Sequence, residues 1–249
     1  GLLSDNRYRY NGKEAQAFLN NPYLDYGARQ YDSDGAVWLG KDPLSEKYYP
    51  ISPYSFCANN PIKFVDSDGR KVYYAPGVSQ KFKDKFAATI KYMNSRGSAG
   101  DIASLEKSDK VYYIGDKDSA GKSNKFVVDG TQTTIYWDPD TAYQTTEGIW
   151  ISPATVLAHE VGHAIEYDKQ PNEFMQNVKK EDGDYDNVEE RRNITTTEQK
   201  AARKHKEIKD GTVTRRNHKM ADKSNVNNLT PYEIEDKFRK INEFINNSN

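Results

Sequence analysis

The sequence predicts an α+β protein in which a short, turn-rich β segment precedes a larger domain of mixed helices and strands. Residues 1–69 are short aromatic runs separated by Asn-Gly, Asp-Gly, Asn-Pro and Asp-Pro pairs, and this spacing permits only short strands. From residue 70 onward, longer apolar patterns with helical spacing alternate with strand-like runs. We therefore expect two domains, at 1–69 and 70–249.

The predicted helices each begin at a capping residue and continue with apolar side chains at helical spacing. They begin after Ser79, at Ser152-Pro153, around Thr195 with Glu198 as capping partner, and at Thr230-Pro231 with Glu233 as capping partner. The predicted strands are 111–114, 125–128 and 133–137, and Asp129-Gly130 is typical of a short hairpin turn between the last two.

The composition excludes several classes of protein. The 249 residues include 36 Lys and Arg against 37 Asp and Glu, whereas dedicated nucleic-acid-binding proteins carry a strong basic excess. No apolar run approaches the roughly eighteen residues that a membrane helix needs, so we expect no membrane span. The single cysteine, Cys57, excludes an internal disulfide framework.

The strongest functional motif is His159-Glu160-Val161-Gly162-His163, within a stretch that is otherwise apolar. Residues i and i+4 of a helix lie on one face, so both imidazoles can bind one Zn²⁺ ion. Zinc lowers the pKa of water to about 7, and Glu160 is placed to act as general base and then as general acid. Random shuffling of this composition gives the motif roughly 0.004 times per chain, which favours a zinc site over two histidines satisfied within a core.

A catalytic zinc ion needs a third protein ligand, and the carboxylates that follow the motif supply the candidates Glu189, Glu190 and Glu198. Two others, Glu173 and Glu181, are weaker because they lie in a polar stretch close to the helix. Glu198 has an alternative role as a capping residue, and Glu189 and Glu190 have the alternative of a solvated helix face. We favour Glu190 and keep Glu198 and Glu189 as alternatives.

Three other features carry weaker predictions. His218 is a candidate donor to the oxyanion of the transition state, or else part of a basic surface turn. Residues 199–223 carry nine Lys and Arg against three Asp and Glu and predict a solvated helix face, with His205 exposed on it. The strand Thr133–Trp137 is either an edge strand that can pair with an extended peptide or an ordinary hairpin strand.

Five stretches before residue 70 resemble the C-terminal end of the RHS/YD-repeat-associated core. They are Tyr8–Glu14 (YRYNGKE), Leu24–Asp32 (LDYGARQYD), Trp38–Pro43 (WLGKDP), Ser52–Pro61 (SPYSFCANNP) and Phe64–Gly69 (FVDSDG). The resemblance implies that 1–69 is the truncated end of a much larger upstream β shell, which encloses a variable C-terminal toxin. It also implies a secreted protein that depends on a secretion apparatus.

Residues 130–220 resemble the zinc-metallopeptidase toxin domains at the tips of such proteins and, more distantly, a type III secreted zinc-protease effector family. The matching stretches are Ser152–Tyr167 (SPATVLAHEVGHAIEY), Glu189–Ile194 (EERRNI), Glu198–Ala202 (EQKAA) and Thr212–His218 (TVTRRNH). In such families the second Glu of the Glu-Glu pair is the more constant, which supports Glu190. The resemblance implies a zincin-like fold, a protein substrate in the cytoplasm of a target cell, and a cognate immunity protein.

The sequence therefore favours a zinc metalloendopeptidase with His159, His163 and Glu190 as metal ligands and Glu160 as the catalytic residue. The first alternative is a non-catalytic interaction domain stabilised by zinc, in which His218 could complete four protein ligands. The second is a nucleic-acid-targeting toxin that uses the basic residues of 199–223, although no nuclease-type motif is present and no nucleic acid is expected as a partner.

Overall fold

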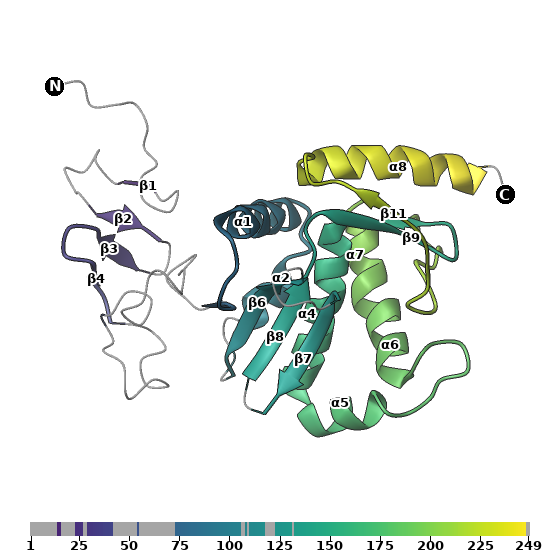
Figure 1. The fold of residues 1–249 in the computed structure, drawn as a ribbon, viewed down its shortest axis with the longest axis horizontal. Coiled ribbons are helices and arrows are strands. Elements are labelled where there is room, and N and C mark those ends of the chain that lie inside the picture. The colour runs from purple at the N-terminus through teal and green to yellow at the C-terminus, as the bar shows by residue number, and fades with distance from the viewer. Residues whose placement is uncertain are drawn as a thin grey trace. The chain divides into compact units, whose positions relative to one another are not determined.

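The computed structural model describes residues 14–15, 23–26, 29–41, 54, 73–105, 108, 110–117, 123–130 and 132–247. The chain forms two compact units, Gly1–Pro76 and Gly77–Asn249, and each is described by itself (Figure 1). The boundary predicted after Gly69 falls outside the described residues and stays a prediction.

Short antiparallel strands form the first unit. They are β1 (Glu14–Ala15), β2 (Leu24–Asp25), β3 (Gln30–Asp32) and β4 (Val37–Trp38), paired in that order. Their core is aromatic: Tyr26 and Trp38 meet edge to face with ring centroids 5.0 Å apart, and the Arg29 guanidinium lies 4.1 Å from the Trp38 ring. Strands of two or three residues match the close spacing of turns in the sequence. Strand β5 (Tyr73–Tyr74) follows near the end of this unit.

The second unit contains both helices and strands, so the predicted α+β class is confirmed. Its helices are α1 (Gln80–Ser95), α2 (Gly100–Leu105), α4 (Pro153–Lys169), α5 (Pro171–Asn177), α6 (Val188–Asn193), the π-helical segment η5 (Ile194–Glu198), α7 (Gln199–Lys204) and α8 (Pro231–Asn247). Its strands are β6 (Tyr112–Asp116), β7 (Lys125–Asp129), β8 (Gln132–Trp137), β9 (Thr141–Thr145), β10 (Trp150–Ile151) and β11 (Met220–Asn225).

The strand β8 lies between two neighbours, parallel to β6 and antiparallel to β7. The hairpin predicted at Asp129-Gly130 is confirmed, with Asp129 opposite Gln132 and Gly130 at a φ of 59°. Of the two interpretations of Thr133–Trp137, the ordinary hairpin strand is confirmed and the edge strand is wrong, because β7 pairs with one side of it and β6 with the other. Among the described strands of this sheet, β7 is the outer one beyond β8.

Helix α8 packs on the second sheet, which has the strand order β10-β9-β11. Its predicted capping box is confirmed: the Thr230 N–H donates to Glu233 Oε2 at 2.8 Å, and the Glu233 N–H donates to Thr230 Oγ1 at 3.3 Å. The ring of Phe238 then stacks on Trp150 with centroids 5.0 Å apart. The apolar side chains of α8 therefore hold the second sheet in place.

Helix α4 is the buried centre of the second unit. The Ser152 hydroxyl caps it by accepting from the Thr155 N–H at 3.3 Å, and Pro153 occupies its first turn, as predicted. Every residue from Pro153 to Ala164 is buried, with β7 and β8 on one side and α6, η5 and α7 on another. A helix that is covered all round can shield polar groups from water, and α4 carries both motif histidines.

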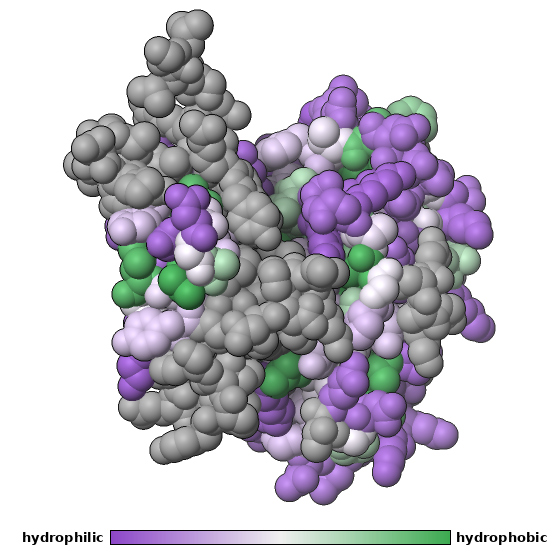
Figure 2. Space-filling view, turned by 60° about the vertical axis from the view of Figure 1, so that its left-hand side comes forward, coloured by the Kyte–Doolittle hydropathy of each residue, from purple (hydrophilic) through white to green (hydrophobic). Residues whose placement is uncertain are grey.

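On the face shown in Figure 2, hydrophilic residues predominate among those described, and hydrophobic ones are scattered between them. Within the described ranges, no helix has the length and the apolar composition needed to span a membrane. Scattered apolar residues of this kind are normal on a protein surface.

A buried polar network anchors the start of α4, and it overturns the prediction that His205 is exposed. Thr155 Oγ1 lies 2.7 Å from His205 Nδ1 and donates to Glu207 Oε2 at 2.7 Å, while His205 Nε2 lies 2.8 Å from Ser98 Oγ. The Ser152 N–H donates to Glu207 Oε1 at 3.1 Å. The chain turns into the interior directly after α7, and His205 is buried there although residues 199–223 carry many charged side chains. Burial lowers the pKa of His205 to about 3 and raises the pKa of Glu207 to about 7.

We predict that Glu207→Gln removes part of the pH dependence of stability. The folded state holds the Glu207 proton more tightly than the unfolded chain, whose ordinary pKa is near 4.5. The tighter binding of this proton therefore contributes fully to the free energy of unfolding below pH 4.5. This contribution, on the order of 3 kcal/mol, is lost as the pH rises through 7. Gln resembles the protonated acid and cannot lose that proton.

Urea unfolding of both proteins at pH 4.5 and pH 8 checks this prediction. The wild-type protein should lose stability relative to the Gln variant as the pH is raised. An equal difference between the two proteins at both pH values would contradict the raised pKa.

Candidate metal centre

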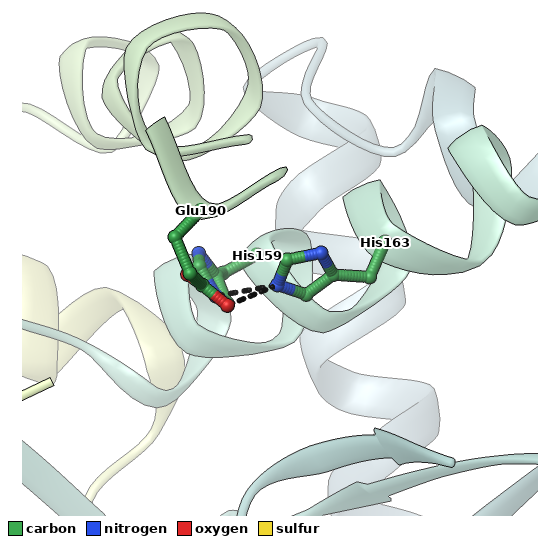
Figure 3. A group of neighbouring side chains, drawn as sticks. All are labelled: His159, His163 and Glu190. Carbon is green, nitrogen blue, oxygen red and sulfur yellow. Dashed lines mark hydrogen bonds and ion pairs between the residues drawn. The ribbon is translucent and has the colours of Figure 1, made fainter. Parts of the chain in front are cut away.

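Helix α4 places the two motif histidines together, as the i,i+4 spacing predicts. The Nε2 atoms of His159 and His163 are 3.1 Å apart, and the two rings are nearly perpendicular. Glu190 of α6 joins them, with Oε1 3.1 Å from His163 Nε2 and Oε2 3.4 Å from His159 Nε2 (Figure 3). All three residues are buried, and their ligand atoms lie within 4.8 Å of one another, so this group could hold a metal ion.

The cap of α6 aims Glu190 at the histidines. Asn187 Oδ1 accepts from the Glu190 N–H at 2.9 Å and so caps the helix, which begins at Val188, two residues before Glu190. The asparagine was the available sequence signal for this helix start, but the predicted helix began at Thr195 instead. That prediction is wrong, because 195–198 continue a helix that begins at Val188.

The two alternative carboxylates lie on the outer sides of the same imidazoles. Glu189 Oε1 is 3.0 Å from His163 Nδ1 and also accepts from Arg192 at 2.6 Å. Glu198 Oε2 is 2.9 Å from His159 Nδ1, which is close enough for an ion pair, although His159 Nδ1 makes no hydrogen bond within the described part of the chain. Carboxylates at this outer nitrogen typically orient a metal-binding imidazole and fix its tautomer.

The π-helical segment η5 brings Glu190 and Glu198 to the same side. In a regular α-helix, residues eight apart point about 80° away from each other. One extra residue in a π turn removes most of that offset. Glu198 is consequently buried against α4, where Thr214 donates to it at 2.6 Å and Arg215 at 2.7 Å. Its predicted role in a capping box is wrong, since it makes no cap hydrogen bond.

The electrostatics of the group favour ionised carboxylates. Burial opposes charge on His163, but Glu189 and Glu190 outweigh it and raise the pKa of His163 to about 9. Burial likewise opposes charge on His159, whose pKa is nevertheless raised by Glu190 and Glu198. Burial would raise the pKa of Glu190, yet the two histidines hold it far below its usual range.

The arrangement also fits a bound metal cation. With their Nδ1 sides facing carboxylates, both imidazoles direct their Nε2 atoms at one point. Glu190 Oε2 is buried and makes no hydrogen bond within the described part of the chain. Two imidazole nitrogens and one such oxygen form a donor set suited to a divalent transition metal, so the residues fit a metal ion.

Glu160 lies beside the metal group and is fixed by a strand. Its Oε2 accepts from the Phe126 N–H of β7 at 2.8 Å, and the residue is 6% exposed. The carboxylate lines a cleft of about 770 Å³, together with His159, His163 and Glu190. A carboxylate and a candidate metal group therefore face one space that is large enough for part of a polypeptide.

His218 lies at the rim of this cleft rather than within the metal group. Asp186 Oδ2 is 2.6 Å from His218 Nδ1 and accepts from its backbone N–H at 2.9 Å. Nε2 is 3.4 Å from Glu190 Oε2, and the side chain is about half exposed. The structure therefore brings His218 close to the centre without making it a fourth member of the group.

Comparison with known proteins found no relatives: a scan against family models, a search of curated proteins and a search of solved structures each gave no match.

We predict that Gly162→Ala disrupts the centre. A Cβ atom at Gly162 would lie 2.0 Å from Asn193 Oδ1 and 2.9 Å from Thr197 Cγ2, so these buried or closely packed side chains, or the helical run that carries them, must shift away from α4. Overpacking of this kind typically costs about 1–3 kcal/mol of stability. The displacement of α6 should also weaken metal binding through Glu190.

Thermal unfolding and Zn²⁺ titration of the variant test this prediction. Gly183→Ala is the matched control, because nothing lies within 4 Å of a Cβ built at Gly183. Wild-type stability and metal affinity in Gly162→Ala would contradict the close packing of α4 on α6.

We predict different effects from two adjacent substitutions. Glu190→Gln removes an ionised member of the group that could hold a metal ion, whereas Glu189→Gln removes a carboxylate that contacts the outer nitrogen of His163. Loss of an orienting group typically lowers metal affinity by about 10- to 100-fold, and loss of the ligand should lower it further.

Competition with a chromophoric chelator, using Zn²⁺ as titrant, measures both affinities, and circular dichroism confirms that the variants are folded. A larger loss in Glu189→Gln than in Glu190→Gln would reverse the two assignments.

Proposed function

We propose that the second unit is a zinc metallopeptidase of zincin-like fold that hydrolyses peptide bonds. The observation that carries this proposal is the position of Glu160 beside the buried group of His159, His163 and Glu190, all lining one cleft. Zinc is the proposed metal because two imidazoles and one carboxylate are a common ligand set of catalytic zinc sites, which keep one position open. A bound zinc ion supplies a Lewis acid and makes water nucleophilic near neutral pH.

Glu160 is the proposed general base and acid. The Phe126 N–H holds Oε2, which leaves Oε1 as the oxygen that takes a proton from water and passes it to the leaving amine. Burial of the side chain keeps bulk water from competing for this proton transfer. The backbone of β7 thus positions the reactive carboxylate.

Strand β7 is also the proposed guide for the substrate. It is the outer strand next to β8 among the described strands, and its residues 125–128 line the cleft. An extended peptide can add to such a strand through main-chain hydrogen bonds, here to main-chain groups other than the Phe126 N–H, which donates to Glu160. This role replaces the one considered for Thr133–Trp137.

The alternative of a zinc-stabilised interaction domain requires four protein ligands. The group in the described part of the chain has three members, with His218 outside it, and this supports the peptidase. The alternative of a nucleic-acid toxin relies on the basic residues of 199–223. One of them, Arg215, is buried and paired with Glu198, which counts against this alternative.

The biological setting that we propose rests on the sequence resemblance alone. We propose that residues 1–69 are the end of an RHS shell and that the peptidase is a secreted effector. It would act on a protein in the cytoplasm of a target cell. In the cell that produces it, a cognate immunity protein would inhibit it.

We predict that Glu160→Gln abolishes hydrolysis and leaves zinc bound, because Glu160 moves protons but is not a ligand. Rates should fall by at least about 100-fold, the lower range for general acid–base catalysis. Proteomic profiling of new N-termini in a target lysate, with metal analysis of the same preparations, measures both properties.

His163→Ala is the control that should lose zinc and activity together. Retained activity in Glu160→Gln, or loss of its zinc, would remove Glu160 from the proposed role.

A further inference from the structure

Helix α5 forms one wall of the cleft above the metal group, and this wall is apolar. Phe174 is buried, with its ring 5.9 Å from that of Phe126 and 6.1 Å from that of His163. The next apolar residues of the wall, Met175 and Val178, also line the cleft but are 44% and 42% exposed. The apolar surface of α5 therefore continues from the core into the open cleft.

The lining of the cleft changes from polar to apolar along β7. Before the strand begins, Asn124 Nδ2 donates to the Tyr143 hydroxyl at 3.2 Å, and Asn124 Oδ1 accepts from the Asp138 N–H at 2.6 Å. Further along, the half-buried Val127 and Val128 line the same cleft as α5. The apolar part of the cleft therefore consists of residues from β7 and α5, and its Phe174 lies next to His163.

We propose that this part of the cleft is a specificity site, in which Met175 and Val178 bind a large aliphatic or aromatic side chain of the substrate beside the bond that is cut. The proposal rests on the proposed peptidase function and names the class of substrate. A polar substrate side chain would leave Met175 and Val178 in contact with water or with an unpaired polar group. An apolar substrate side chain would instead cover them.

The position of these residues distinguishes them from ordinary exposed apolar side chains. Such side chains are normal when they are scattered singly over a surface. Met175 and Val178 instead share a cleft with His159, Glu160 and the outer strand β7. A peptide paired with β7 obtains general affinity from its main chain, and α5 then supplies the side-chain preference.

The test uses the zinc-loaded full chain and a synthetic peptide library in which all side chains occur around each bond. We expect Leu, Ile, Met and Phe to predominate on one side of the cut bond. For a good substrate, replacing that residue by Gly should lower kcat/KM at least about tenfold, the lower range of discrimination for apolar side chains. Met175→Glu and Val178→Glu should remove this discrimination and favour Lys, whereas Met175→Leu should keep it.

Gln176→Glu is the matched control, since Gln176 is exposed on the same helix and does not line the cleft. A second measurement needs no turnover: fluorescence anisotropy compares binding of the Leu and Gly peptides to Glu160→Gln. The Leu peptide should bind about tenfold more tightly, and Met175→Glu in that background should equalise the two.

The outcomes separate the two proposals. Cleavage without a preference, or a preference that survives Met175→Glu and Val178→Glu, would overturn the specificity site and leave the peptidase standing. If no peptide is cut, the peptidase proposal fails. Equal binding of the Leu and Gly peptides would then overturn the specificity site as well, whereas a tenfold difference abolished by Met175→Glu would support an apolar peptide site without catalysis.

Discussion

Two imidazole nitrogens and one carboxylate group converge inside the second unit, and the surrounding structure depends on keeping them together. The nitrogens of His159 and His163 are 3.1 Å apart, and Glu190 lies 3.1 Å and 3.4 Å from them. Burying such groups is costly unless opposite charges compensate one another. Glu189 and Glu198 hold the outer nitrogens, and Arg192 and Arg215 neutralise these two carboxylates in turn. A metal ion between the two imidazoles and Glu190 would add a positive charge at the centre of this arrangement of paired charges.

The packing of two helices makes that convergence geometrically possible. Gly162 lacks a side chain where α4 meets the helical run of α6 and η5, and Asn193 occupies the space and donates to the His159 carbonyl at 2.8 Å. The π turn in the same run aligns Glu190 with Glu198. The glycine of the motif therefore allows the close packing that brings Glu190 to the two histidines.

Local patterns were sufficient to predict much of the fold and part of the site. The caps at Ser79, Ser152 and Thr230 are short-range signals, and the structure starts helices directly after each of them. The histidine pair was equally accessible, because residues four apart in a helix meet whatever surrounds them. Glu190 was a preferred choice among three carboxylates, and the structure gives each of the three a separate position around the histidines.

The incorrect predictions concern features that depend on distant parts of the chain. The order of β6, β8 and β7 follows from pairing across the sheet, so the sequence of β8 could not reveal which strand is outermost. The helix start predicted at Thr195 is an exception, because Asn187 is a local capping signal for the helix that begins at Val188. His205 lies among basic residues typical of a surface, yet it is buried through its contacts with Thr155 and Ser98.

The most direct test of the central claim is anomalous diffraction at the zinc absorption edge from crystals of the full chain grown with Zn²⁺. One strong peak is expected at about 2.0–2.2 Å from His159 Nε2, His163 Nε2 and a Glu190 oxygen, with a position left open to solvent. Absence of a peak at these atoms, or a fourth protein ligand in the open position, would contradict it.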